Sequence, residues 1–284
     1  MLADCDAPLA RPRRLVVVLG DQLDPEGPGL SGFDRAQDAI WMAEVEEEAT
    51  RVWSHKARIA LFLAAMRRFA AGQRARGRRV VYRALGEHPH RSLDAALAAD
   101  LDLLRPERVV LVEPGEWGLR EALHATLRAS GLPWEERQDR HFLCRREEFA
   151  AFARGRRALR MEAFYRWLRR RTGVLMNGSA PLGGRFNFDA ENRAAFGRAG
   201  PGRVPAPLRF LPDRETRAVL AFVARRFAEH PGALEGFDWP LDPERGAGRA
   251  GRLPRRAACP ASGATRMRCG AGSRCSSIPG FRPP

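Results

Sequence analysis

Short apolar runs alternate with longer segments of helical spacing along the first half of the chain. Five runs are typical of strands in a parallel sheet, where a strand buried on both faces reads as a continuous apolar stretch. These runs are residues 15–19, 39–43, 79–84, 109–112 and 133–137. Apolar residues spaced for one helix face lie between them, at 59–69 with a stop near Gly77, at 93–104 and at 117–129. This alternation predicts a doubly wound α/β fold of the Rossmann or flavodoxin type, with a five-stranded parallel sheet and flanking helices.

The pattern changes after residue 140. Helices are predicted at 147–153, 160–171 and 214–229, and the Gly-, Pro- and Asn-rich stretch 176–212 is typical of an extended linker. The stretch 243–284 has only four large apolar residues, too few to offset chain entropy, so disorder is expected there. The predicted organisation is a flexible N-terminus at 1–14, an α/β domain at 15–140, helices and an interdomain linker at 141–240, and an aberrant, disordered tail at 241–284.

The net charge of +15 is a weak guide to partners. The stretch 243–284 holds nine arginines and one acid, so about half of the excess charge lies in the predicted tail. A basic surface therefore supports nucleic-acid binding only weakly. No apolar stretch approaches the roughly 20 residues that cross a bilayer, and the N-terminus lacks the order of a secretory signal, so a cytoplasmic protein is expected. Five cysteines without paired or metal-ligand spacing predict neither a disulfide framework nor a metal site.

The loops after the first, second and fourth predicted strands form the candidate ligand site, because doubly wound sheets bind ligands beyond the carboxyl ends of their strands. They carry Gly20-Asp21-Gln22, the acidic stretch 44–48 and Glu113-Pro114-Gly115-Glu116. Neither a dinucleotide fingerprint nor a triphosphate loop is present. An acidic rim repels phosphate but accepts hydrogen bonds from ring N–H and sugar hydroxyl groups, which favours a neutral heterocycle with a polyol chain. The alternative is that Asp21 only caps the following segment.

Basic and aromatic residues interleave on the helix predicted at 160–171. One interpretation is a phosphate-contacting face formed by outward-pointing Arg166, Arg169, Arg170 and Arg171. The favoured alternative is an amphipathic helix with a solvated basic face, which buries Met161, Phe164, Tyr165 and Leu168. The spacing of the remaining polar residues reveals no pair of nucleophile and base, so no catalytic residue is predicted.

Several short motifs occur together and in one order over residues 15–240. They are Leu19-Gly20-Asp21-Gln22-Leu23, Ala43-Glu44-Val45, Ser54-His55-Lys56, Glu113-Pro114-Gly115-Glu116-Trp117, Met161-Glu162 with Phe164-Tyr165-Arg166, Thr172-Gly173 with Leu175-Met176, and 183–189 (GGRFNFD) with Glu191-Asn192-Arg193. Jointly they resemble the photolyase-related family of the cryptochrome/photolyase superfamily, the bacterial (6-4) photolyases that carry an iron–sulfur cluster. Phe186 and Ala43 depart from the family pattern, which usually has Trp at the first position and has Cys in some members at the second.

The resemblance implies a DNA-repair lyase of the flavoprotein type, in which FAD in a C-terminal helical domain donates an electron to a pyrimidine (6-4) photoproduct in light. It makes 15–140 the antenna domain and implies a ribityl-lumazine chromophore near Gly20, Asp21, Gln22, Ala43, Glu44 and Glu48. It also implies contacts with DNA or between domains for Arg166, Arg169, Arg170, Arg185 and Asn187.

The helical half that the resemblance implies is expected from about Pro240, where the unpatterned tail begins instead. Reading the codons of 258–282 from their third bases permits LPRFGRYQDAVRGGEPVLFHPGLSP, which resembles the family's continuation. We therefore expect a reading frame lost shortly after Trp239, and a truncated chain that binds neither FAD nor a 4Fe-4S cluster and binds DNA weakly or not at all. The alternatives are a stand-alone chromophore- or nucleotide-binding module without catalysis, and a non-functional fragment.

Overall fold

The computed structural model describes residues 11–189, 195, 197–198, 200 and 208–241. The chain divides into two compact units, one of Met1–Arg140 with Arg209–Asp242 and one of His141–Leu208 with Pro243–Pro284. The segment that begins at Arg209 therefore returns to the first unit, whereas the sequence pattern groups 141–240 together. The predicted disordered tail, apart from its first residue, and most of the predicted flexible N-terminus lie outside the described residues.

The first unit is built on one five-stranded sheet in which all neighbouring strands are parallel. In the spatial order β3-β2-β1-β4-β5, the strands are β1 (Arg14–Val17), β2 (Ala39–Ala43), β3 (Arg79–Arg83), β4 (Arg108–Val112) and β5 (Trp134–Arg137). The predicted doubly wound α/β fold is thus confirmed. The three inner strands are buried along almost their whole length, whereas the edge strands β3 and β5 are mostly half-buried.

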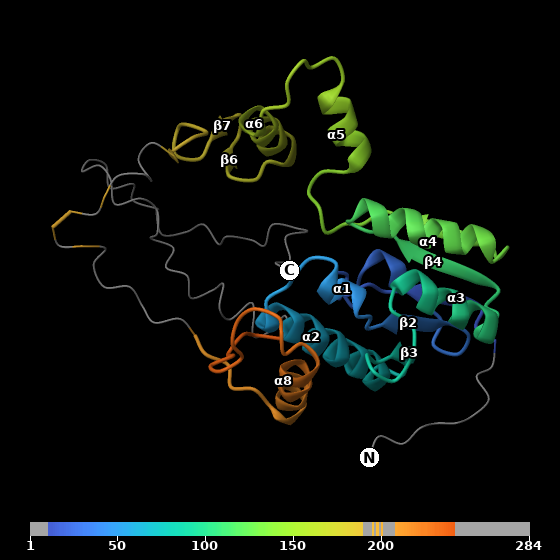
Figure 1. The fold of residues 1–284 in the computed structure, drawn as a ribbon. Helices are drawn as coiled ribbons and strands as arrows, with labels where there is room; N and C mark the ends of the chain where they lie inside the picture. The colour runs from blue at the N-terminus through green and yellow to red at the C-terminus, as the bar shows by residue number, and fades with distance from the viewer. Residues whose placement is uncertain (1–10, 190–194, 196, 199, 201–207, 242–284) are drawn as a thin grey trace. The chain divides into compact units, whose positions relative to one another are not determined.

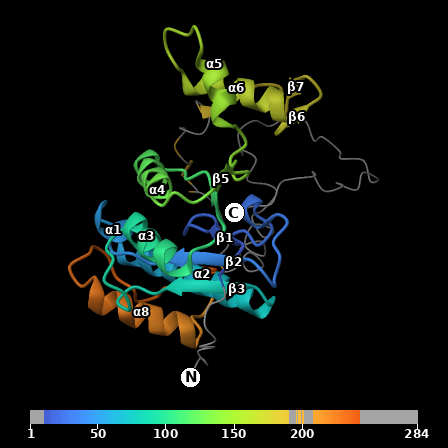
Figure 2. The same ribbon diagram turned by 90° about the vertical axis from the view of Figure 1, so that its right-hand side faces the viewer.

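Helices cover both faces of this sheet (Figure 2). α2 (Lys56–Ala75) packs on one face, while α3 (Leu93–Leu104) and α4 (Trp117–Ala129) pack on the other. Two short elements, η1 (Pro28–Leu30) and α1 (Glu47–Thr50), lie in the loops before β2 and after it. No helix in the described part of the chain is long and apolar enough to cross a membrane.

A helix from the far end of the described chain completes the first unit. α8 (Arg214–Arg226) lies alongside α2 and is drawn in orange in Figure 1. Val219 and Val223 of α8 are buried in one apolar cluster with Ala60 of α2. Asp213 caps α8 by accepting the Thr216 N–H at 2.9 Å, and its carboxylate also pairs with Arg68 of α2. Contact with both the sheet and α8 explains why α2 is alanine-rich, because small side chains permit close approach on two sides.

The second unit contains α5 (Arg146–Ala153), α6 (Met161–Thr172) and a short antiparallel pair of strands, β6 (Met176–Asn177) and β7 (Ala180–Pro181). An aromatic cluster joins the two helices, with ring centroids 5.2 to 6.4 Å apart. Its members are Phe149, Phe152, Phe164 and Trp167. These rings are the apolar contact between α5 and α6.

Asp38 precedes β2 and is 1% exposed, and its buried carboxylate links residues at the start of the sheet. It accepts hydrogen bonds from Nε of Arg13 at 3.0 Å, from Nε of Arg14 at 2.9 Å and from the Asp34 N–H at 2.8 Å. Burial alone raises the pKa of this carboxyl, but the three donors outweigh burial and lower the pKa to about 2. The ionised carboxylate therefore stabilises the folded state above about pH 4, and this contribution is lost as the pH falls toward 2.

We expect Asp38→Asn to lower the free energy of unfolding by about 3 kcal/mol at pH 7, because the arginines lose their anion. Between about pH 4 and pH 2 the wild-type protein should lose about 2 kcal/mol of this advantage as Asp38 takes up a proton. Urea unfolding at neutral and acid pH measures both effects. Asp102→Asn, on the exposed side of α3, is the matched control and should change little. Equal stabilities of the two variants at pH 7 would contradict the role given to Asp38.

Candidate functional site

A pocket of about 580 Å³ lies in the first unit, beyond the carboxyl ends of β1, β2 and β4. The loops after these strands line it, together with the N-terminal half of α2 and with Phe227, which follows α8. The chain leaves β2 and β4 toward opposite faces of the sheet, and ligands of doubly wound sheets bind at such a point. The volume is in the range of small-molecule sites, about 300–1,000 Å³.

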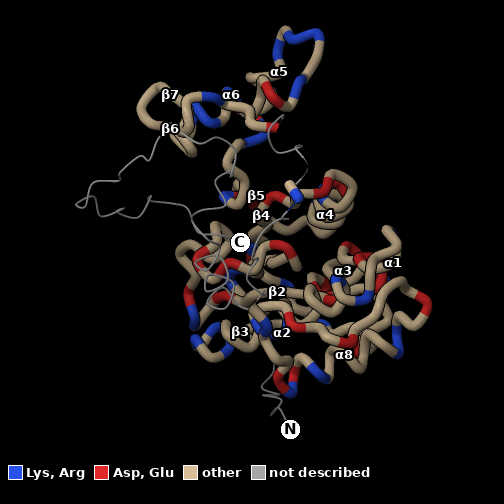
Figure 3. The backbone as a smooth tube through the Cα atoms, turned by 90° about the vertical axis from the view of Figure 1, so that its left-hand side faces the viewer, with Lys and Arg blue, Asp and Glu red and all other residues tan. Residues whose placement is uncertain are grey.

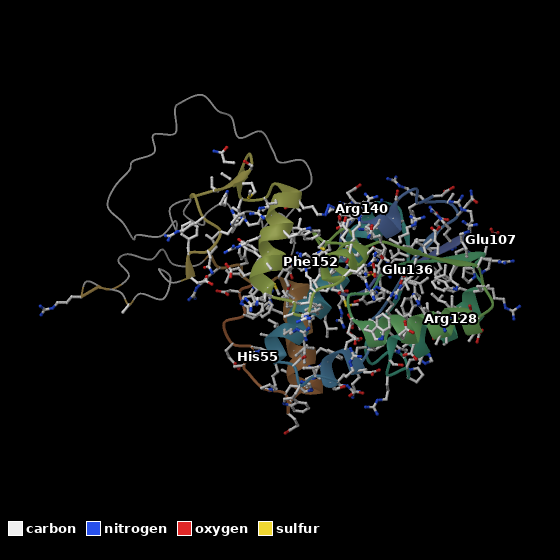
Figure 4. All side chains as sticks on the ribbon, turned by 90° about the horizontal axis from the view of Figure 1, so that it is seen from above. His55, Glu107, Arg128, Glu136, Arg140 and Phe152 are labelled. Carbon is white, nitrogen blue, oxygen red and sulfur yellow. The ribbon has the colours of Figure 1, made fainter. Side chains whose placement is uncertain are left out.

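One side of the pocket is an apolar wall to which α2 contributes most. Figure 4 labels His55, which caps α2 and also lines the pocket. The larger apolar side chains that line the pocket are Leu19, Trp53, Ile59, Phe62, Leu63, Met66, Leu85, Leu93, Leu119 and Phe227. A Cβ atom at Gly20 would lie 3.0 Å from Sδ of Met66, so a larger residue here would require the Met66 side chain to shift. A wall of this kind suits the flat ring of a heterocycle.

Glu44, at the end of β2, carries a buried carboxylate under the pocket, of which 1% is exposed. Its Oε1 accepts from Nε of Arg67 at 2.7 Å and from the Tyr82 hydroxyl at 2.5 Å. Its Oε2 accepts from Nη2 of Arg67 at 2.8 Å and from the Leu85 N–H at 2.9 Å. A carboxylate has about four acceptor positions, so the protein itself fills the capacity of Glu44. The hydrogen bond from Arg67 also raises the pKa of that guanidinium.

Asp21 and Glu48 form the acidic part of the pocket rim. Glu48 is exposed, yet the protein atoms around it desolvate its carboxyl enough to raise the pKa of that group. The charge of Arg51 opposes this rise, whereas the nearby charges of Asp21, Glu47 and Glu116 add to it. These two carboxylates add acceptor atoms to a pocket that has an apolar wall.

An ion pair between Arg51 and Glu116 links the two loops that flank the pocket, with Nη2 and Oε2 3.1 Å apart. Glu116 also caps α4, since its carboxylate accepts from the N–H groups of Leu119 at 2.6 Å and Gly118 at 2.9 Å. These backbone hydrogen bonds lower the pKa of Glu116. The hydrogen bond that Arg51 donates to Glu116 raises the pKa of Arg51. Both side chains are about half exposed, so the pair positions the loops more than it stabilises the fold.

Five of the six residues predicted for the antenna site line this pocket, namely Gly20, Asp21, Ala43, Glu44 and Glu48. Gln22 lies beside it, and its Nε2 donates to the backbone carbonyls of Val112 at 3.4 Å and Glu113 at 3.2 Å. Gln22 thereby joins the loop after β1 to the loop after β4. The binding role of all six residues stays a prediction.

Several pocket residues do not follow from the strand-end rule. The helical spacing of Ile59, Phe62 and Met66 predicts a buried face, but it does not predict that this face extends past the sheet edge into a pocket. Phe227 lies in a predicted helix, yet no local signal identifies the surface that it covers. Trp53 lies in a loop without periodicity and carries no signal of its own.

In the second unit, α6 gathers its arginines around one ring. The guanidinium carbons of Arg166, Arg169 and Arg170 lie 5.6, 5.2 and 5.0 Å from the centroid of Phe186. The predicted outward orientation of Arg169 is wrong, because this residue is 5% exposed and donates to the carbonyl of Leu175. The chain turns back after α6, and the backbone at Val174 and Leu175 covers the Arg169 side chain. Figure 3 colours the basic residues of this helix blue.

The alternative interpretation of α6 also needs correction. Met161 and Tyr165 are 78% and 41% exposed, so the prediction that the helix buries them is wrong. Arg185 lies over the ring of Phe188 at 4.5 Å, and Oδ1 of Asn187 accepts from the Asp189 N–H at 2.8 Å. Contact with DNA or between domains stays a prediction for both residues, as it does for the three arginines around Phe186.

Two comparisons relate the chain to known proteins. The model of a family described as deoxyribodipyrimidine photo-lyase-related protein matches residues 16–239. The (6-4) photolyase of Agrobacterium fabrum (strain C58 / ATCC 33970) is 43% identical over 225 residues, which are 79% of this chain and 44% of that protein. The chain thus spans less than half the length of this relative. The matched residues include every residue that lines the pocket.

The network around Glu44 can be tested through Tyr82, one of two tyrosines in the chain. Burial and the neighbouring Glu44 carboxylate raise the pKa of Tyr82 far above its usual value. We expect the folded wild-type protein and Tyr82→Phe to give the same tyrosinate absorbance between about pH 9 and pH 11. In concentrated urea the wild-type protein should titrate one tyrosine more than the variant. Ionisation of Tyr82 in the folded protein over this range would contradict the buried network.

Proposed function

Because this chain belongs to the deoxyribodipyrimidine photo-lyase-related protein family, we propose that its first unit binds a ribityl-lumazine antenna in the strand-end pocket. The chain would thus retain the antenna half of a family whose role is light-driven repair of (6-4) photoproducts in DNA. The observation that carries the proposal is the pocket itself, an apolar wall with carboxylates at its mouth and no phosphate loop. We also propose a cytoplasmic location, as the resemblance to DNA-repair proteins implies.

The residues of the pocket fit such a chromophore. A flat ring would pack against Phe62 and Met66, and the hydroxyl groups of a ribityl chain would donate to Asp21 and Glu48. Glu44 has no acceptor position left, so its role is to hold α2 and β3 in place beneath the ligand. A bound ribityl-lumazine would supply absorption of near-ultraviolet and blue light.

We further propose that Arg166, Arg170 and Arg185 of the second unit contact DNA phosphates. Guanidinium groups form bidentate hydrogen bonds with phosphate, and Arg166 and Arg170 lie near one another around Phe186. Arg169 donates to the backbone carbonyls of Val174 and Leu175 instead, so it would hold this part of the chain in place without contacting DNA.

The loss of the reading frame after Trp239 is part of the same proposal. It is supported by the family match, which stops at residue 239, and by the family-like string in the shifted frame. Resequencing the genomic stretch that encodes 235–284 tests it. We expect one inserted or deleted base in this stretch, after which a shifted frame continues the family sequence. An intact reading frame with no inserted or deleted base would contradict the hypothesis.

We expect the purified chain to bind ribityl-lumazine with 1:1 stoichiometry in an equilibrium titration followed by absorbance. Asp21→Ala and Glu48→Ala should each weaken binding about tenfold, because each removes a charged acceptor of a ligand hydroxyl. Glu121→Ala, on the exposed side of α4, is the matched control and should bind as the wild type does. Absence of binding, or equal affinity of all four proteins, would contradict the proposed site.

A further inference from the structure

Trp53 is a large aromatic residue that remains exposed at the pocket. It lies in the loop between α1 and α2, lines the pocket and is 59% exposed. Its indole stacks on the ring of His230, with centroids 4.1 Å apart and planes at 20°. One face of the indole is therefore covered by protein, while much of the side chain is open to the pocket and solvent. An exposed indole beside a cavity is a surface that gains free energy when an apolar ring covers it.

His230 supports the indole rigidly from behind. It is 6% exposed, and its Nδ1 lies 2.9 Å from the carbonyl oxygen of Ser54. Phe227 packs edge-on against the His230 ring, with centroids 5.1 Å apart and planes at 80°. The ring of Trp53 thus stacks on His230, and Phe227 in turn supports the His230 ring edge-on. Rigid support lowers the entropy that a ligand would lose in ordering the indole.

Backbone contacts fix the same loop. The Lys56 N–H donates to the carbonyl of Pro231 at 2.9 Å. Gly232 has a φ of +88°, and a Cβ atom there would collide with the ring of His55. No residue other than glycine fits this approach, so the segment after α8 lies directly against the start of α2. The loop that carries Trp53 is consequently held in place on both sides of the indole.

We infer that Trp53 is the stacking residue of the pocket and determines its selectivity for planar heterocycles over non-planar polyols. The inference rests on the proposed function, which it deepens by naming the surface that recognises the ring. Asp21 and Glu48 recognise hydroxyl groups at the rim, whereas Trp53 recognises aromaticity. Stacking of a heterocycle on a tryptophan is favourable and depends little on the substituents of the ring, so riboflavin should use the same surface as ribityl-lumazine.

The test compares Trp53→Leu and Trp53→Phe in the full chain, with ribityl-lumazine and riboflavin as probes. Trp53→Leu keeps an apolar side chain over His230 but removes the aromatic face, and we expect it to weaken binding of both probes about tenfold. Trp53→Phe keeps a ring and should weaken binding less than about threefold. Trp117→Leu, which replaces a tryptophan of similar exposure outside the pocket, is the matched control and should bind as the wild type does.

A spectroscopic readout separates stacking from loop stability. A stacked ring shows a red-shifted, weakened absorption band, which Trp53→Leu should lose and Trp53→Phe should keep in part. Wild-type affinity and an unchanged band in Trp53→Leu would overturn the inference while the proposed function stands. Tenfold weaker binding in Trp53→Leu, together with wild-type affinity in the Asp21 and Glu48 variants, would support the stacking residue and contradict the proposed recognition of the polyol. If the wild-type chain binds neither probe, both proposals fail.

Discussion

The carboxylate of Glu44 can be buried only because protein donors fill all of its acceptor positions, and much of the first unit is arranged by that requirement. The donors come from α2, from β3 and from the loop after β3, so the carboxylate fixes three elements relative to the end of β2. His88 adds a contact to the backbone carbonyl of Glu44 itself, at 2.9 Å. An unpaired carboxylate at this depth would be very unfavourable, and the elements that supply its donors therefore have little freedom to move apart. The part of the pocket that these elements line is held in place by the same hydrogen bonds.

A second constraint comes from the return of the chain to the first unit. α8 and the residues after it do not extend the sheet, yet they cover the outer side of α2 and support the loop that carries Trp53. Most of the pocket is therefore made by residues 19–119, and Phe227 comes from a segment distant in sequence. The ring that supports Trp53 also comes from that segment, whereas the rim carboxylates of Asp21 and Glu48 follow β1 and β2 closely.

The sheet could be predicted from the sequence because its physical signal is local. Runs such as 109–112 are apolar without interruption, which is typical of a strand covered on both faces. The strand-end rule then locates Asp21 and Glu48 correctly at a pocket, since chain topology alone determines which loops meet. Contacts between distant elements carry no such signal. The sequence predicts Glu44 as one more acidic rim residue, because it does not show that Arg67 and Tyr82 donate to its carboxylate. It likewise predicts an outward Arg169, because it does not show that this side chain donates to the carbonyl of Leu175. The packing of the apolar face of α8 against α2 is likewise a contact between distant segments, which no local pattern predicts.

The discontinuity of the first unit has a consequence for how the protein is made. A ribosome releases 11–140 before 209–241, so the sheet and its flanking helices can form while the outer face of α2 still lies in water. At that stage the stretch around Ala57, Ala60 and Ala64 lacks the apolar contacts that α8 later supplies, and the indole of Trp53 has no ring behind it. A chain released only as far as residue 208 would therefore lack Phe227 in the pocket and His230 behind Trp53, even with its sheet complete. Completion of the pocket depends on a part of the chain that is made after the sheet.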